Sequence, residues 1–244
     1  MKRITAVLLS CAAGVASAAD ITVSAAASLN NAFREAASAY EATHPGVKVL
    51  LNFGASDALV AQISKGAPVD VFASADQDAM DKAQPHVAPG SRRDFASNRL
   101  VVAVPVQSTL QLHTLADLGQ PAFKRLTTGN PASVPVGRYT KAALEKAGQW
   151  TALEQKFVFA TNVRQALDYV ARGEVEAGFV YQTDVASQAD KVRSVLAVPT
   201  VTPITYPLAV IKAAPNAAGA RSFADFILSA GGQAILARHG FGKP

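Results

Sequence analysis

Two serines in the first part of the chain stand where hydrogen-bond donors gather in folded proteins. Ser28 follows three alanines in the stretch ITVSAAASLNNAFR (21–34), and Ser56 follows Gly54-Ala55 in a second stretch of the same pattern. In both, a short apolar run leads through small residues into a segment with helical periodicity. A serine at a helix start can cap free backbone N–H groups, and these groups with the helix dipole bind anions. We therefore predict one wall of an oxyanion site here, although an ordinary helix cap is the simpler interpretation of either serine alone.

Three residues further along the chain fit the same donor chemistry. Val136 and Val163 stand at two predicted helix starts, where backbone N–H groups lack partners inside the helix. Tyr181 ends a predicted strand and carries a hydroxyl group. Taken singly, core packing is the simpler interpretation of both valines, and a buried core aromatic residue is an equal alternative for Tyr181. The hypothesis of an anion site therefore rests on the set of five residues.

Residue patterns typical of other chemistries are missing from the sequence. Its histidines show no metal-ligand spacing; they are His44, His86, His113 and His239. The sequence contains neither a Gly-x-Ser-x-Gly nucleophile elbow nor a glycine-rich loop for phosphates. Cys11 is the only cysteine, and it lies in the predicted leader described next, so the mature chain has no cysteine nucleophile, disulfide or thiolate ligand. We expect no enzyme activity, no metal cation bound directly by the protein and no cofactor.

The first residues have the organisation of a secretory signal peptide over 1–18. Lys2-Arg3 forms a basic start, an apolar run follows over 4–15, and Ala16-Ser17-Ala18 fits a small-residue cleavage site, so that the mature chain begins near Ala19. The apolar run is too short for a membrane span. We therefore predict an exported, periplasmic protein.

An alternative is that the chain is a lipoprotein. Leu8-Leu9-Ser10-Cys11 resembles a bacterial lipobox, in which Cys11 would carry the lipid anchor. The apolar run before this cysteine is very short and the cleavage signal after it is good, so the signal peptide is the favoured interpretation.

The charge of the chain argues against a nucleic-acid partner. The sequence has 23 basic and 18 acidic residues. Loss of Lys2 and Arg3 with the leader leaves 21 basic residues against 18 acidic ones, a net charge of about +3. The basic residues are scattered without a basic run, so no binding of nucleic acid is expected. A mildly basic exported protein is compatible with a small anionic ligand.

The elements that must position the five residues alternate between strand and helix. In the first third, the pattern predicts strands over 21–24, 47–52 and 68–73, with helices that start near Ser28, start at Ser56 and run over 77–83. This alternation predicts a mostly parallel sheet with helices on both faces. Ligands bind beyond the carboxyl ends of the strands in such sheets, and Ser28 and Ser56 fall at that edge.

The middle of the chain has a strand–helix alternation of its own, which predicts a second α/β lobe. The predicted strands are 98–105, 126–131, 157–160, 177–181 and 195–198, and the predicted helices are 138–147 and 162–173. A late strand over 206–211 and a helical tail over 218–241, which Gly231-Gly232 should interrupt, return the chain to the first sheet. We therefore expect a discontinuous first lobe over 19–102 and 206–244, a second lobe over 103–205, and a hinge where the chain crosses twice between them.

Five stretches of the chain resemble the molybdate-binding proteins of bacterial ABC importers. They are AAASLNNAF (25–33), GASDALVAQISKGAPVDVFASAD (54–76), GNPASVPVGRYTKAALEKAG (129–148), NVRQAL (162–167) and AGFVYQTD (177–184). The resemblance implies the two-lobed fold of periplasmic binding proteins, with the ligand in the cleft between the lobes. It also implies a tetrahedral dianion, molybdate or tungstate, held by hydroxyl and backbone N–H groups without a bound metal or cofactor. The implied partner is an ABC permease in the membrane, and we expect a monomer.

Carried over residue by residue, the resemblance gives roles to the same five positions. It implies that Ser28 and Ser56 donate through their hydroxyl and N–H groups. It implies that Val136 and Val163 donate through backbone N–H groups and Tyr181 through its hydroxyl. A site made only of donors suits molybdate, which is fully deprotonated at neutral pH. Such a site disfavours hydrogen phosphate, whose unpaired O–H would cost about 1–3 kcal/mol, and it excludes sulfate by size.

Two charged residues leave the choice of anion open. Asp57 follows Ser56, where serine is common in the family, and we expect it to face solvent from the first helical turn. The alternative is that Asp57 accepts a proton from hydrogen phosphate, so a binding protein for phosphate or sulfate is the main rival. Arg138 could add positive field to the cleft, although a surface position is expected. An exported enzyme and a ligand-sensing module are rivals of other classes, and no catalytic base or signalling segment in the sequence supports them.

Overall fold

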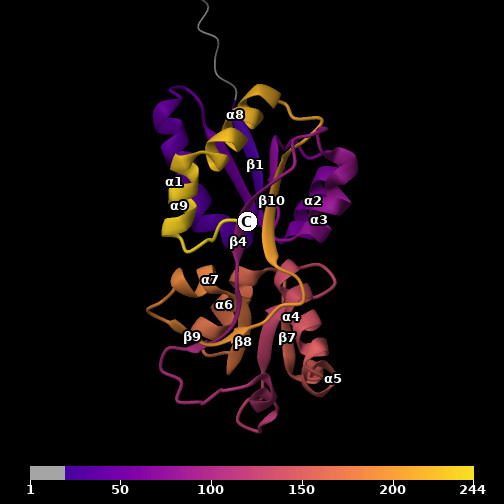
Figure 1. Ribbon diagram of the computed structural model, residues 1–244, viewed down its shortest axis with the longest axis vertical. Helices are drawn as coiled ribbons and strands as arrows, with labels where there is room; N and C mark the ends of the chain where they lie inside the picture. The colour runs from indigo at the N-terminus through magenta and orange to yellow at the C-terminus, as the bar shows by residue number, and fades with distance from the viewer. Residues whose placement is uncertain (1–19) are drawn as a thin grey trace, which may run out of the picture.

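The computed structural model describes residues 20–244, so the predicted signal peptide and Cys11 lie outside the described part of the chain. It contains two five-stranded sheets, one in each half of an elongated molecule (Figure 1). Helices flank both sheets, which confirms the predicted two-lobed α/β fold. We call the part built on the sheet that contains Ile21 the first lobe and the other part the second lobe. Within residues 20–244, no helix is long and apolar enough to cross a membrane.

The first sheet has the strand order β2-β1-β3-β10-β4. Its strands are β1 (Ile21–Ala26), β2 (Val49–Gly54), β3 (Val71–Ala73), β4 (Arg93–Asn98) and β10 (Ile204–Val210). β1 runs parallel to β2 and β3, whereas β10 pairs antiparallel with β3 and β4. β1 and β3 are buried almost throughout, as central strands are when helices cover both faces of the sheet.

Helices cover the two faces of the first sheet (Figure 1). They are η1 (Ala27–Leu29), α1 (Asn30–Thr43), α2 (Ser56–Ser64), α3 (Gln77–Ala83), η2 (Gln84–His86), α8 (Ala217–Leu228) and α9 (Ala230–Arg238), where η denotes a 3-10 helix. On one face, Phe33 of α1 packs against Phe95 of β4 and Phe223 of α8. On the other face, Leu59 of α2 and Met80 of α3 belong to a second apolar cluster. The sheet is thus held between two helical layers.

The second sheet has the strand order β7-β6-β8-β5-β9. Its strands are β5 (Leu100–Pro105), β6 (Leu126–Gly129), β7 (Phe157–Ala160), β8 (Ala177–Tyr181) and β9 (Val192–Val198). Its helices are η3 (Leu115–Gly119), α4 (Pro135–Lys146), α5 (Trp150–Leu153), η4 (Glu154–Lys156), α6 (Val163–Ala171) and α7 (Gln182–Ala186). β6 runs parallel to β7 and β8, and β5 runs antiparallel to β8 and β9. Each sheet is therefore mixed but mostly parallel: four of its strands run in one direction, and only β10 in the first sheet and β5 in the second run in the other.

Several details differ from the expectations raised by the sequence; among them, the helix expected over 138–147 begins earlier, at Pro135. The sequence pattern does not predict β4, because most of its side chains are polar; the strand forms at the edge of the first sheet, where it pairs with β10. The helical tail breaks at Ser229 and not at Gly231-Gly232. The hydroxyl oxygen of Ser229 accepts a hydrogen bond from the N–H of Gly232 at 3.3 Å and so caps α9.

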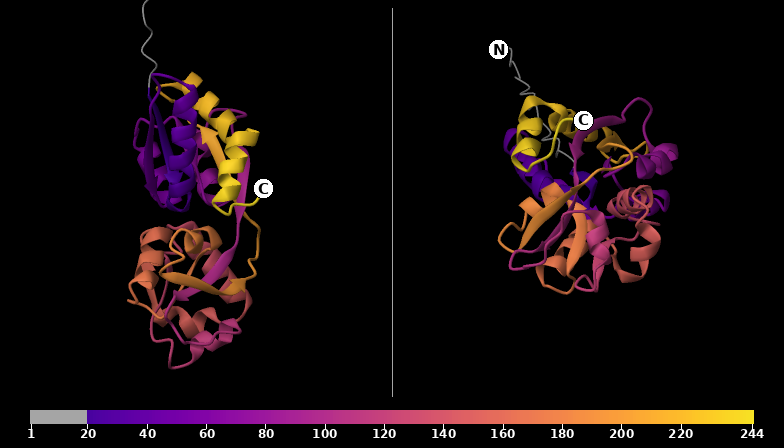
Figure 2. Two further views of the ribbon diagram at one scale, coloured as in Figure 1. Left: turned by 90° about the vertical axis from the view of Figure 1, so that its left-hand side faces the viewer. Right: turned by 60° about the horizontal axis from the view of Figure 1, so that its bottom comes forward.

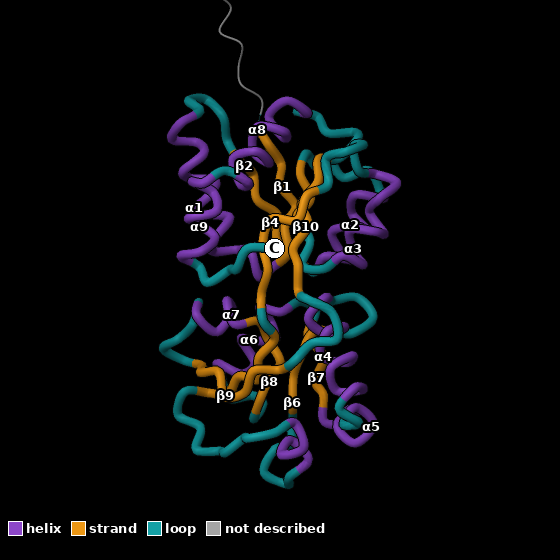
Figure 3. Tube along the Cα trace, in the orientation of Figure 1, coloured by secondary structure: helices purple, strands orange, loops and turns teal. Residues whose placement is uncertain are grey.

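Two neighbouring segments connect the lobes (Figures 2 and 3). One is the short junction between β4 and β5 at Asn98–Leu100, and the other joins β9 to β10 between Val198 and Ile204. β5 belongs to the second sheet and β10 to the first, so both crossings lie slightly before the boundaries expected at 102/103 and 205/206. The division of the chain into lobes at those residues remains a prediction.

Candidate functional site

A cavity lies between the two lobes, at the carboxyl ends of their parallel strands. All five residues singled out in the sequence line it: Ser28 and Ser56 from the first lobe, and Val136, Val163 and Tyr181 from the second. The cavity is small, with room for a single small solute. Its other lining residues are small or apolar apart from one asparagine, and none of them is charged. The structure thus brings the five residues together, and their contact with a ligand remains a prediction.

The wall from the first lobe is built on two adjacent strand ends. Ala26 at the end of β1 is the register partner of Gly54 at the end of β2. Ser28 lies in the 3-10 helix that follows β1, and Ser56 is the first residue of α2 after β2. Because the residues at these strand ends are small, a ligand can approach the backbone closely. The repeated pattern in the sequence therefore corresponds to a pair of neighbouring junctions in space.

The serine hydroxyls do not cap their helices, so the helix-cap interpretation is wrong for both. Neither η1 nor α2 has a hydrogen bond from a capping side chain. The hydroxyl oxygen of Ser56 instead accepts a hydrogen bond from the N–H of Ala75 at 3.0 Å. Because this bond uses a lone pair of the oxygen, the proton of the Ser56 hydroxyl stays available to an acceptor in the cavity.

A short chain of polar groups holds the other serine. The hydroxyls of Ser28 and Tyr206 lie 3.0 Å apart, and the amide nitrogen of Asn98 donates to the Tyr206 oxygen at 3.2 Å. If the Tyr206 hydroxyl donates to Ser28, the proton of Ser28 is free for a ligand. The sequence did not identify Tyr206 and Asn98, because no local pattern shows that β4 and β10, which are far apart in the chain, pair beside Ser28. They support Ser28 without lining the cavity.

The wall from the second lobe contains two helix N-termini. α4 begins at Pro135, which has no N–H, and no side chain caps the helix, so Val136 supplies the first available N–H group. At α6, the side chain of Asn162 accepts from the N–H groups of Arg164 and Gln165 at 3.0 Å and 3.1 Å. This cap leaves the N–H of Val163, the first residue of the helix, on the wall of the cavity. Both N-termini direct the positive end of a helix dipole toward it.

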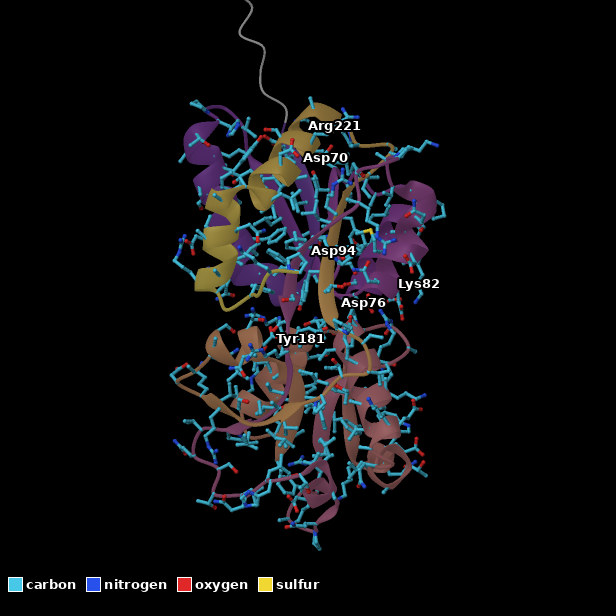
Figure 4. The ribbon with its side chains drawn as sticks, in the orientation of Figure 1. Asp70, Asp76, Lys82, Asp94, Tyr181 and Arg221 are labelled. Atoms are coloured by element: carbon cyan, nitrogen blue, oxygen red, sulfur yellow. The ribbon has the colours of Figure 1, made fainter. Side chains whose placement is uncertain are left out.

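Tyr181 completes this wall at the end of β8, and Figure 4 shows it at the boundary between the lobes. Its side chain is buried, and within residues 20–244 its hydroxyl oxygen has no hydrogen-bond partner. Burial raises the pKa of Tyr181 well above its usual value, so the hydroxyl remains protonated. A buried hydroxyl without a partner costs about 1–3 kcal/mol. An anion in the cavity would accept from this hydroxyl and remove that cost.

Two charged residues beside the cavity do not occupy the positions expected from the sequence. Asp57, expected to face solvent, is 13% exposed and pairs with Lys82 and Arg138. Arg138, expected at the surface, is 19% exposed and also contacts Asp76, a residue not identified from the sequence. Arg138 belongs to α4 in the second lobe, whereas both carboxylates belong to the first lobe. The expectations failed because the partners lie on opposite sides of the cleft and far apart in sequence.

Burial and pairing act in opposite directions on these charged groups. Burial by itself would raise the pKa of Asp57, but hydrogen bonds from Lys82 and Arg138 outweigh it and lower the pKa. Burial raises the pKa of Asp76 even though Arg138 lies beside it. Burial works against the charge on Arg138, but the two carboxylates outweigh it and raise its pKa. The guanidinium therefore stays charged and holds the two carboxylates from the other lobe.

A second arginine flanks the opposite side of the cavity. The Nε of Arg164 lies 2.8 Å from Asp184 Oδ1 within the second lobe. Its terminal nitrogens reach the first lobe, where they donate to the backbone oxygen of Ser28 at 3.3 Å and to Asn31 Oδ1 at 3.2 Å. Asp184 is fully buried, and burial raises its pKa to about 6 against the effect of Arg164. Among residues 20–244, no group of histidine and acidic side chains is arranged to hold a metal ion.

Residues 21–242 match the family of bacterial extracellular solute-binding proteins. The molybdate-binding protein ModA of Escherichia coli is 37% identical over 228 residues, which cover 91% of this chain and 88% of that protein. The putative ABC transporter substrate-binding lipoprotein YvgL of Bacillus subtilis is 33% identical over 224 residues, 91% of this chain and 85% of that one. The solved structure of the Azotobacter vinelandii periplasmic molybdate-binding protein aligns with a TM-score of 0.82 at 26% identity, over 92% of this chain and 99% of that one. With its two lobes and its interlobe cavity, this chain belongs to the bacterial extracellular solute-binding proteins.

Proposed function

We propose that this protein is the solute-binding component of an ABC importer and that it binds molybdate, and also tungstate, between its lobes. The observation that carries the proposal is the buried Tyr181 hydroxyl, which has no partner within residues 20–244 and lies in a cavity without a charged lining residue. Such a cavity offers hydrogen bonds to a fully deprotonated oxyanion. The names of the relatives from E. coli and A. vinelandii support molybdate as the anion.

The proposed ligand contacts are the five residues on the cavity wall. Ser28, Ser56 and Tyr181 donate through hydroxyl groups, and Val136 and Val163 donate through backbone N–H groups. Donors from both lobes stabilise the arrangement in which the lobes enclose the ligand, because a ligand favours the state with which it makes more contacts. In this proposal the protein needs no cofactor and catalyses no reaction; it only binds and delivers its ligand.

The position of Asp57 weakens the case for phosphate. Its Oδ1 accepts from Lys82 and its Oδ2 accepts from Arg138 at 2.7 Å. The carboxylate does not line the cavity, so it is not placed to accept the proton of a bound hydrogen phosphate. A site whose lining carries no carboxylate to accept this proton therefore favours molybdate over phosphate.

The protein delivers its ligand to a membrane permease in this proposal. We propose that it acts as a monomer in the periplasm after the leader is cleaved near Ala19. A lipid anchor at Cys11 is the alternative, and the B. subtilis relative is described as a lipoprotein. Mass spectrometry of the protein from its native membrane and periplasmic fractions distinguishes a chain that begins near Ala19 from one that begins at a lipidated Cys11.

Isothermal titration of residues 19–244 with molybdate, tungstate, sulfate and phosphate tests the choice of anion. We expect one binding site for molybdate and tungstate and far weaker binding of sulfate and phosphate. At a ligand concentration of 100 times Kd, molybdate should stabilise the fold by about 2.7 kcal/mol, which a thermal-unfolding scan will register. Tight binding of sulfate or phosphate would overturn the anion proposed here, and the absence of binding by all four would overturn the oxyanion function.

A further inference from the structure

Arg138 connects the two lobes beside the ligand cavity without lining it. Its Nε and Nη2 lie 2.8 Å and 2.6 Å from Asp76 Oδ2, and its Nη2 lies 2.7 Å from Asp57 Oδ2. Arg138 stands near the N-terminus of α4 in the second lobe, whereas Asp57 and Asp76 stand at the N-termini of α2 and α3 in the first. Figure 4 shows Asp76 on the side of the first lobe that faces the second.

The two buried carboxylates of this cluster, Asp57 and Asp76, both have a cationic partner only while the lobes are in contact; the exposed Asp78 of the first lobe lies 3.8 Å from Arg138 Nε. Asp57 and Asp76 bring two negative charges to the first lobe, and Lys82 of the same lobe pairs with Asp57. Arg138 brings the second positive charge from the other lobe. The side chains of Asp57 and Asp76 are only 13% and 5% exposed. Because a buried charge that loses its partner is strongly unfavourable, separation of the lobes is opposed until water reaches Asp76.

The helix turns that carry the cluster also carry proposed ligand donors. Arg138 follows Val136 by two residues on α4, and Asp57 follows Ser56 directly on α2. A lobe movement that places Ser56 and Val136 around one ligand therefore also places Asp57 against Arg138. Closure of the cavity and formation of the ion pairs are one event in this geometry.

The opposite side of the cavity has a weaker connection between the lobes. Arg164 crosses to the first lobe through hydrogen bonds to the backbone oxygen of Ser28 and to Asn31. Its acidic partner, Asp184, lies in its own lobe. The first-lobe groups that accept from Arg164 are neutral, so this crossing lacks the opposite charges that Arg138 meets in the first lobe. The two sides of the cleft are therefore held unequally.

We propose that Arg138, Asp57 and Asp76 form an interlobe latch that slows the release of the bound anion. This inference rests on the proposed function, since the anion is its ligand. Arg138 is a positioning residue, because it stabilises the closed arrangement of the lobes and does not contact the anion. The ligand leaves when the lobes part, so the latch lowers the dissociation rate, and because it also holds part of the ligand-free protein closed it does not raise the association rate.

Stopped-flow measurement of molybdate release tests the latch in wild type, Arg138→Gln, Asp57→Asn and the double variant. We expect Arg138→Gln to release molybdate about 10-fold faster or more, with an association rate no lower than that of wild type. The effects of the two single changes should not add in the double variant, because both remove the same pair. The matched control is Arg172→Gln, which removes an exposed arginine of the second lobe that pairs with Glu174, and it should leave release unchanged.

Equal dissociation rates in wild type and Arg138→Gln, or fully additive effects in the double variant, would overturn the latch. Small-angle X-ray scattering of the ligand-free proteins gives a readout that does not depend on molybdate. We expect Arg138→Gln to have a larger radius of gyration than wild type, because more molecules are open. If molybdate fails to bind wild type, the proposed function fails and scattering alone decides on the latch: a larger radius supports it and an equal radius overturns it.

Discussion

Both lobes contribute hydroxyl groups to the cavity, but these groups differ in whether they already have a hydrogen-bond partner. In the first lobe, the Ser56 oxygen accepts from the N–H of Ala75, and the Ser28 hydroxyl contacts that of Tyr206. In the second lobe, the Tyr181 hydroxyl has no partner among the described residues. The first lobe thus holds a half-site that is preformed without a ligand, and the second lobe holds a half that a ligand completes.

This difference suggests an order of events during binding. In the proposed function, a ligand would meet the preformed donors of the first lobe at no cost of reorganisation, and the second lobe would then close on it. Closure with a ligand gives the Tyr181 hydroxyl an acceptor, whereas closure without one leaves the hydroxyl buried and unpaired at a cost of about 1–3 kcal/mol. The second lobe therefore discriminates between the loaded and the empty cleft.

The largest expected effect is on the free energy of unfolding, and it comes from the buried Asp184 carboxyl of the second lobe. Burial raises the pKa of Asp184 to about 6, so between about pH 4 and pH 6 the folded protein holds a proton that the unfolded chain releases. The contribution of Asp184 to the free energy of unfolding therefore decreases as the pH rises through this range, by up to about 3 kcal/mol. Urea unfolding of wild type and Asp184→Asn at about pH 4 and about pH 7 measures it.

The quantity to compare is the unfolding free energy of wild type minus that of Asp184→Asn. Because the asparagine does not titrate, other ionisable groups cancel in this difference. The difference should be larger at the lower pH. A difference that is equal at both pH values would show that Asp184 titrates normally and that the second lobe does not carry this cost.

The next effect isolates the unpartnered hydroxyl. Tyr181→Phe should weaken molybdate binding by about 10- to 100-fold, because a hydrogen bond to a charged group contributes about 1.5–3 kcal/mol. It should not lower the stability of the ligand-free protein, since the hydroxyl that is removed has no partner there. Titration calorimetry and urea unfolding give the two numbers, and Tyr169→Phe, outside the cavity lining, is the matched control. A clear loss of ligand-free stability would contradict the account of Tyr181.

The smallest effect on molybdate affinity is expected from Ser56→Ala in the first lobe. Unlike Tyr181→Phe, this change should also lower the stability of the ligand-free protein. Ser56→Ala removes a proposed ligand donor and also the acceptor of the buried Ala75 N–H. It should therefore weaken molybdate binding by up to about 10-fold and lower the free energy of unfolding by about 1–3 kcal/mol without ligand. Ser64→Ala, at the exposed end of the same helix, controls for the loss of a serine from α2. If Ser56→Ala and Tyr181→Phe had the same effect on ligand-free stability, the contrast between the lobes would be wrong.

Local patterns in the sequence were sufficient to locate the cavity residues. Ser28 and Ser56 follow apolar segments that the fold places side by side, and the carboxyl ends of parallel strands meet at one edge. The strands over 157–160 and 177–181 and the helix over 77–83 lie where the periodicity predicts them. These features depend on interactions between residues close in sequence, which is the information that a periodic pattern carries.

Contacts between residues that are far apart in the sequence could not be predicted in the same way. Asp57 is separated from Arg138 by 81 positions in the sequence, and Asn98 is separated from Tyr206 by 108. No local pattern distinguishes an aspartate in a first helical turn that faces solvent from one that faces an arginine of the other lobe. Asp76 did carry a usable signal, because an aspartate directly before a helical segment is a preferred cap, and its side chain accepts from the N–H of Ala79.

The proposed main-chain donors at Val136 and Val163 have a consequence for mutational studies. Nearly every amino acid supplies the same N–H group, so side-chain variation at these two positions leaves that part of the recognition chemistry intact. Proline is the exception, since it lacks the N–H and yet is tolerated in the first turn of a helix. A mutational scan for loss of anion capture should therefore recover many different substitutions at Tyr181, but mainly proline and bulky residues at the two valines.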